Sequence, residues 1–212
     1  MLIRTYNQCK KVVDQSKILV ATDHKKIFKL CEKNNINTMM TSKKCLTGTD
    51  RIAEVAKKIK KSFYINVQGD EPICNPSDIK KIISYARKFP NNVINGFTEI
   101  KDINTFISPH IPKVIFRNDG DLIYMSRAPI PSNKKRLLIK AWRQVCIYSF
   151  PYKSLKVFSN FTKKTKLEEI EDLELNRFIE IGHKVKMIKL SNKSIAVDTK
   201  DDLKKVRRLI KR

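Results

Sequence analysis

Helical and strand patterns alternate along the first half of the chain, and this alternation constrains the fold more than any other feature of the sequence. Short apolar runs at 17–23 and 63–68 end in Asp23 and in Gly69-Asp70, as buried strands do. Amphipathic helical patterns surround them at 2–9, 25–34, 50–61 and 76–86. The resulting order, α-β-α-α-β-α, predicts an α/β fold with a mostly parallel sheet and helices on both of its faces.

The middle of the chain follows a different pattern. Residues 114–117 and 122–125 flank Asn118-Asp119-Gly120-Asp121, which predicts a β-hairpin inserted around an Asp-Gly turn. A basic loop at 133–136 and a strand at 145–148 follow. The last third predicts a helix from about residue 167 that ends at Gly182, strands at 185–190 and 194–197, and a basic helix at 200–211. No repeat or linker interrupts the pattern, so residues 1–212 are predicted to form a single domain.

The net charge of +24, from 45 Lys and Arg against 21 Asp and Glu, calls for an explanation. A surplus of this size is typical of proteins that bind polyanions such as nucleic acids. The basic residues are mostly Lys, however, and they lie where amphipathic helices present a polar face, as at 56–61. The charge is therefore interpreted as solvated surface, with nucleic-acid binding as the alternative.

The sequence contains few features of a secreted, membrane or metal-binding protein. Its longest uncharged run, Phe89–Thr98, is too short to span a bilayer, and the first residues lack the apolar stretch of a signal peptide. The 5 cysteines are scattered without a C-x-x-C pair, and the 3 histidines show no ligand spacing. We therefore expect a soluble cytoplasmic protein without a disulfide framework, a zinc site or a catalytic triad.

Two acidic residues follow predicted strands, at Asp70 and Asp198. Ligands of open α/β sheets bind beyond the carboxyl ends of the strands, and Mg²⁺ is usually held there by one or two carboxylates together with substrate phosphates. In the alternative interpretation, Asp70 caps the next turn and Asp198 helps to cap the following helix. Because both acids occupy the same kind of position, the pair predicts a shared metal site with a catalytic role.

Small residues precede a helix in Thr47-Gly48-Thr49-Asp50-Arg51. Free backbone N–H groups at such a position can bind a phosphate or the polar edge of a base, although helix capping by Thr49 or Asp50 explains the same residues. Basic side chains near the hairpin could clamp an anionic substrate, with ordinary surface residues as the alternative. They are Lys113, Arg117, Arg127 and Arg143.

These segments, in this order, resemble the CMP-Kdo synthetases, which are 3-deoxy-manno-octulosonate cytidylyltransferases. The matching stretches are 19–23, Thr47-Gly48-Thr49-Asp50-Arg51-Ile52-Ala53-Glu54-Val55, Asn66-Val67-Gln68-Gly69-Asp70-Glu71-Pro72, 126–131, 147–148, 171–174, 197–199 and 202–203. The resemblance spans the chain. It implies a Rossmann-like fold of the nucleotide-diphospho-sugar transferase type. It also implies transfer of CMP from CTP to the anomeric hydroxyl of Kdo or a related ulosonic acid, with release of pyrophosphate, for lipopolysaccharide biosynthesis.

The resemblance also implies roles for individual residues. It assigns Mg²⁺ binding to Asp70 and Asp198, and it places the loop of Thr47, Gly48 and Thr49 against the cytosine. Arg127 is expected beside the reacting groups. The side chains expected at the sugar are Gln68, Lys113, Gln144, Tyr148 and Glu174. The expected partners are CTP, an acidic 3-deoxy sugar and a second copy of the chain, paired partly through the hairpin.

The chain departs from the family pattern in three places. The family begins with a strand and a basic loop that binds the triphosphate, whereas Met1 corresponds to a position after that loop. We therefore expect the sheet to lack a central strand. We favour a true start further upstream, with an inactive partner subunit as the alternative. Gln144 replaces the usual His and Leu175 the usual Gln, which leaves a Kdo variant or another ulosonic acid as alternative substrates.

Overall fold

The computed structural model describes residues 1–210. Its helices are α1 (Leu2–Lys10), η1 (Gln15–Lys17), α2 (Lys25–Lys33), α3 (Gly48–Lys58), α4 (Pro76–Lys88), α5 (Ile103–Ile107), α6 (Tyr152–Phe158), α7 (Lys166–Glu171), α8 (Leu175–Glu180) and α9 (Lys200–Ile210). Its strands are β1 (Val20–Thr22), β2 (Thr38–Met40), β3 (Phe63–Val67), β4 (Val93–Glu99), β5 (Lys113–Phe116), β6 (Leu122–Ser126), β7 (Trp142–Pro151) and β8 (Val185–Lys189). None of the described helices is long and apolar enough to cross a membrane.

The main sheet is built around the long strand β7. One side of β7 pairs with β4, and the other side pairs first with β5 and then with β3. Strand β8 continues the sheet parallel to β4, and β6 continues it antiparallel to β5. Because β7 runs antiparallel between β3 and β4, the sheet is mixed. The prediction of a mostly parallel sheet is therefore wrong in this respect, although β3, β4 and β8 do point the same way.

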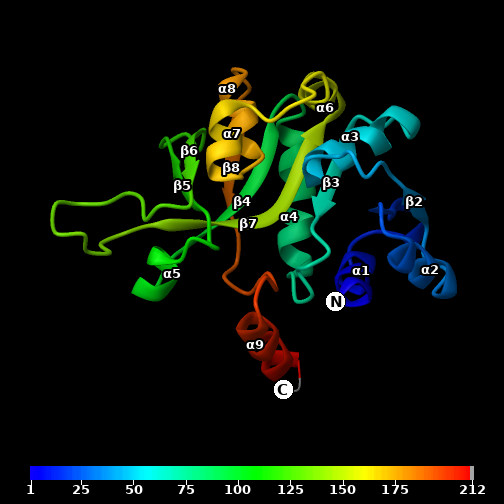
Figure 1. Ribbon diagram of the computed structural model, residues 1–212, viewed down its shortest axis with the longest axis horizontal. Coiled ribbons are helices and arrows are strands. Elements are labelled where there is room, and N and C mark those ends of the chain that lie inside the picture. Colours follow the sequence, from blue (N-terminus) through cyan, green and yellow to red (C-terminus); the bar gives the residue numbers. More distant parts are fainter. Residues whose placement is uncertain (211–212) are drawn as a thin grey trace.

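Strands β1 and β2 form a separate, parallel two-stranded sheet. Together with α1 and α2 they lie beyond β3 at one side of the molecule (Figure 1) and share a small core around Tyr6, Cys31 and Ile36. Within residues 1–210, β3 has a strand partner only in β7. The β1–β2 pair is thus separate from the main sheet.

Apolar side chains cover both faces of the main sheet, as predicted. Successive residues of a strand point to opposite faces, and in β7 Tyr148 and Phe150 belong to one cluster while Val145 and Ile147 belong to the other. The first cluster takes residues from α3, α6 and α8, and the second takes residues from α4. Helices on both faces of the sheet therefore pack against β7.

The predicted hairpin is present as β5 and β6. Its turn is closed by hydrogen bonds from the Gly120 N–H to the Arg117 carbonyl (2.8 Å) and from the Arg117 N–H to the Asp121 carbonyl (2.8 Å). Gly120 has a φ of +90°, a backbone conformation that residues with a Cβ rarely adopt. The segment 127–141 then leaves the sheet as an extended arm (Figure 1) before the chain returns as β7.

Several local predictions differ from the structure. The helix expected from about 167 to 181 is divided into α7 and α8, because Asp172 between them adopts the left-handed conformation with φ +51°. Residues 194–197 are not a strand, and α3 begins at Gly48 rather than at Asp50. Strands β2 and β4 are not among the predicted elements. The last residue of the predicted helix 200–211 lies outside the described residues.

Candidate active site

A cleft of about 400 Å³ opens beyond the carboxyl end of β3. Four residues predicted for metal, nucleotide or catalytic roles line it: Thr47, Asp70, Arg127 and Asp198. Four residues predicted for the sugar also line it: Gln68, Gln144, Tyr148 and Glu174. A second, more open depression along 160–166 contains lysines and none of the predicted site residues. The first cleft therefore brings together most of the residues that the sequence singled out.

The two predicted metal ligands meet in this cleft. The Val197 N–H donates to the Asp70 carbonyl at 3.0 Å, which ties the segment carrying Asp198 to the end of β3. Asp70 Oδ1 is buried without a hydrogen-bond partner. Burial raises the pKa of Asp70, and the nearby negative charge of Asp198 raises that pKa further. An unpaired buried carboxylate oxygen beside a second carboxylate fits a bound cation.

Helix capping does not account for Asp198. The Thr199 N–H and hydroxyl both donate to Asp202 Oδ2, at 3.0 and 2.6 Å, and these two residues cap α9 between them. Within residues 1–210, no group of three or more His, Cys, Asp or Glu side chains could hold a metal ion by itself. Mg²⁺ commonly takes only one or two carboxylates from a protein, and its remaining ligands are waters and substrate phosphates.

Of the predicted loop residues Thr47, Gly48 and Thr49, only Thr47 lines the cleft. Thr47 and Asp50 cap α3 together in a capping box, so capping does explain these residues; the predicted role of Asp50 is confirmed, and Thr47 takes the role predicted for Thr49. The loop nevertheless faces the site, because a Cβ on Gly48 would lie 3.7 Å from Glu174 Oε2 and 4.0 Å from the Gln68 Nε2. Thr49 is buried.

Hydrogen bonds fix two further polar side chains that line the cleft. Gln144 Nε2 donates to the Tyr148 hydroxyl at 3.0 Å and to Asn95 Oδ1 at 3.1 Å. Asn95 is fully buried and donates in turn to the carbonyls of Val145 and Ile147. Burial raises the pKa of Tyr148 well above its usual range, so its hydroxyl keeps its proton. The Gln144 amide and the Tyr148 hydroxyl are therefore held in fixed orientations.

Arg127 lines the cleft, and hydrogen bonds to three backbone carbonyls fix its guanidinium. Its Nε donates to the Glu171 carbonyl (2.6 Å), Nη1 to the Pro109 carbonyl (2.9 Å) and Nη2 to the Asp172 carbonyl (3.1 Å). Because neutral carbonyls take up these donors, the positive charge is only partly balanced, by an Asp172 carboxylate oxygen 3.6 Å from Nη2. Arg127 thus supplies an oriented positive charge at the edge of the site.

Lys113 is the one predicted sugar residue that the structure does not bring into the cleft. It is fully buried, and its ammonium donates to the carbonyls of Ser108 (2.8 Å) and Arg127 (2.5 Å). Burial, together with the positive charge of the neighbouring Arg127, lowers the pKa of this lysine to about 8. Lys113 therefore holds the backbone around Arg127 in place.

Three further residues of the site escaped the sequence analysis. His110 and Cys146 line the cleft, and Asn95 lies beneath it. Burial raises the pKa of Cys146, so it is present as the thiol. Neither His110 nor Cys146 belongs to a recognisable motif. Asn95 did leave a signal, as a lone amide in the apolar run 93–97.

Comparison with known proteins decides the family. The family model described as "Cytidylyltransferase" matches residues 1–190. The chain belongs to the cytidylyltransferase family. A 3-deoxy-manno-octulosonate cytidylyltransferase of Chlorobaculum tepidum is 32% identical over 216 residues, which cover 100% of this chain and 87% of that relative. The mitochondrial 3-deoxy-manno-octulosonate cytidylyltransferase of Arabidopsis thaliana is also 32% identical, over 100% of this chain and 74% of the plant protein.

A solved structure agrees with this assignment. The structure of CMP:2-keto-3-deoxy-manno-octonic acid synthetase complexed with CTP superposes on this cytidylyltransferase with a TM-score of 0.89 and 27% identity. The alignment covers 99% of this chain and 87% of that structure. The predicted family and the α/β fold are thus confirmed, and the chain is a nucleotidyltransferase.

Proposed function

We propose that this cytidylyltransferase transfers CMP from CTP to the anomeric hydroxyl of Kdo and releases pyrophosphate. The observation that carries the proposal is the cleft itself, which is lined by the acids Asp70 and Asp198, by Thr47 of the loop and by the hydrogen-bonded Gln144 and Tyr148. The names of the two relatives and of the CTP complex support the choice of substrates.

In this reaction the anomeric oxygen attacks the α-phosphorus of CTP. A new P–O bond to the sugar forms, the bond to pyrophosphate breaks, and the hydroxyl proton is lost. Catalysis of phosphoryl transfer consists largely of positioning and of stabilising negative charge. Asp70 and Asp198 would hold Mg²⁺, which neutralises phosphate charge when bound. Arg127 adds a fixed positive charge, the Gly48 loop orients the base, and Gln144 and Tyr148 offer hydrogen bonds to the sugar.

Pyrophosphate release by the purified protein tests the proposal. We expect turnover that needs CTP, Mg²⁺ and Kdo together, and little turnover when UTP replaces CTP. CTP binding without turnover on Kdo would contradict the assignment. Turnover on another ulosonic acid would then place the sugar specificity at Gln144 and Leu175, whereas no turnover on any such sugar would favour an inactive partner subunit.

We further propose that the activated sugar serves lipopolysaccharide biosynthesis in the cytoplasm. The support is the reaction itself, because an activated ulosonic acid is consumed by a glycosyltransferase that builds this acid into a glycan. Loss of the gene is expected to leave lipopolysaccharide without Kdo, which composition analysis of the glycan measures. Unchanged Kdo content would contradict this role.

We also propose that two copies pair partly through the β5–β6 hairpin and the arm 127–141 that follows it. Leu137 and Ile139 on this arm are 56% and 81% exposed, an unusual position for large aliphatic side chains. Light scattering is expected to give the mass of a dimer for the wild type and of a monomer for Ile139→Glu, since a charge in an apolar contact is costly. A monomeric wild type would contradict the pairing.

A further inference from the structure

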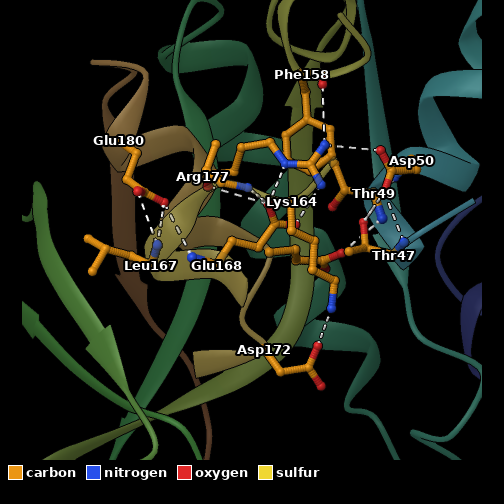
Figure 2. A network of polar contacts seen from close by, with 12 residues as sticks. Thr47, Thr49, Asp50, Phe158, Lys164, Leu167, Glu168, Asp172, Arg177 and Glu180 are labelled. Carbon is orange, nitrogen blue, oxygen red and sulfur yellow. Dashed lines mark hydrogen bonds and ion pairs between the residues drawn. The ribbon is translucent and has the colours of Figure 1, made fainter. Parts of the chain in front are cut away.

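A buried ion pair lies behind the nucleotide loop, on the side away from the cleft. Arg177 in α8 has no exposed surface, and neither has its partner Glu168. Arg177 Nε and Nη2 donate to the two carboxylate oxygens of Glu168 at 2.5 and 2.7 Å, and the guanidinium stacks 3.7 Å above the Phe158 ring. Two parallel hydrogen bonds and a stacked ring hold the guanidinium in a single orientation (Figure 2).

The remaining nitrogen of this guanidinium points at α3. Arg177 Nη1 donates to Asp50 Oδ1 at 3.1 Å, and the Asp50 side chain is only 14% exposed. The other oxygen, Oδ2, accepts from the Thr47 N–H at 2.9 Å and from the Thr47 hydroxyl at 2.8 Å. The two oxygens of Asp50 therefore have separate partners, one in the buried ion pair and one in the loop (Figure 2).

A second capping box in the same chain shows that capping alone does not need the arginine. Thr199 and Asp202 at the start of α9 make the same pair of bonds to a single oxygen, at 3.0 and 2.6 Å. There the other oxygen meets only an exposed lysine, Lys205, at 4.0 Å. The contact between Arg177 and Asp50 is thus additional to what the helix end requires.

Helix α8 holds the other end of the loop as well. Glu174 stands three residues before Arg177, and its Oε2 accepts from the Thr49 N–H at 2.9 Å. Gly48 lies between the two anchored residues, and in the part of the chain that the structure describes its N–H has no hydrogen-bond partner. Hydrogen bonds therefore fix the loop on both sides of Gly48, whose N–H remains free.

We propose that Arg177, oriented by Glu168, is a positioning residue that fixes the nucleotide loop through Asp50 and thereby sets the selectivity for cytosine over uracil. This inference rests on the proposed function. N3 of cytosine is a hydrogen-bond acceptor where uracil carries an N–H donor, so a rigid backbone N–H can pair with cytosine and is left unpaired by uracil. A mobile loop would adapt to either base, and selectivity would fall.

The test uses Asp50→Asn, which keeps the size of the side chain and leaves one oxygen for Thr47. It removes the negative charge that faces Arg177. We expect KM for CTP to rise about tenfold and the ratio of kcat/KM for CTP over UTP to fall about tenfold, with kcat changed less than KM. Neither KM nor this ratio depends on how much of the enzyme is folded, so partial unfolding cannot imitate the result.

Asp102→Asn is the matched control. Asp102 caps α5 by accepting from the Thr105 N–H at 2.8 Å and from the Thr105 hydroxyl at 2.7 Å, and it is exposed. This change removes a capping carboxylate of the same kind away from the loop. We expect wild-type KM and wild-type base selectivity.

A second variant, Arg177→Lys, tests whether the planar geometry of the guanidinium is needed. A lysine keeps the charge but lacks the planar geometry that serves Glu168 and Asp50 together. We expect the same loss of selectivity as in Asp50→Asn, and no further loss in the double variant, because both changes act through one contact. Folded Asp50→Asn with wild-type KM and selectivity would overturn the inference. A wild type that does not bind CTP in calorimetry would instead overturn the proposed function.

Discussion

Replacing Asp70 by Asn is expected to lower kcat for CMP transfer about a thousandfold while CTP still binds. Asn has the volume of Asp but neither its charge nor its second anionic oxygen. The Oδ1 atom of Asp70 is buried without a partner, so in Asp70→Asn the proposed Mg²⁺ would lose a carboxylate ligand and the phosphates would lose the charge that this ion would balance. Pyrophosphate release measures kcat, and titration calorimetry without metal measures the affinity for CTP.

Asp201→Asn is the control for this experiment. Asp201 lies three residues after Asp198 but is exposed on α9, where it pairs with Lys204 at 3.1 Å. We expect wild-type rates, because a surface ion pair of this kind contributes little to stability. Asp70→Asn with more than a tenth of the wild-type kcat would contradict the proposed metal site. Loss of CTP binding in the absence of metal would point to a folding defect.

The position of Asp70 could be predicted from the sequence because the signals that place it are local. An apolar strand at 63–67 followed by a glycine and an acid puts the carboxylate at the sheet edge whatever lies elsewhere in the chain. The same holds for the hairpin, since the Asp-Gly turn determines which residues face each other.

The central place of β7 could not be predicted, because strand pairing is a long-range property. Its neighbours β3 and β4 come well before it in the chain, and an apolar strand pattern is the same whether its neighbour runs parallel or antiparallel. Strand order is therefore decided by the packing of the complete chain rather than by any one segment.

Buried polar residues were missed for a related reason. Arg177 has the sequence character of a surface residue, and it is buried only because partners elsewhere in the chain, Asp50 among them, satisfy its hydrogen bonds. Lys113 was predicted to contact the substrate, but two backbone carbonyls bind its ammonium group instead. Burial of a polar side chain follows from its partners, and those become visible only in the folded structure.

Gly96→Ala is expected to destabilise the protein by about 1–3 kcal/mol, as overpacking of a core does. Gly96 follows the irregularity in β4 after Asn95, and a Cβ there would lie 2.2 Å from Leu190 Cδ1 and 3.2 Å from Val145 Cβ. Urea denaturation measures the change in the free energy of unfolding. Gly69→Ala is the control, because its Cβ would meet only Leu2 Cδ1, at an ordinary 3.5 Å.

The double variant Gly96→Ala with Leu190→Ala identifies the contact responsible. Leu190→Ala alone leaves a cavity and is expected to cost about 2–5 kcal/mol. In the double variant the new methyl group enters that cavity, so the combined cost is expected to fall short of the sum by about 1 kcal/mol or more. Strict additivity would show that Leu190 does not exclude a side chain at position 96. The close approach of β4 to the segment after β8 would then need another explanation.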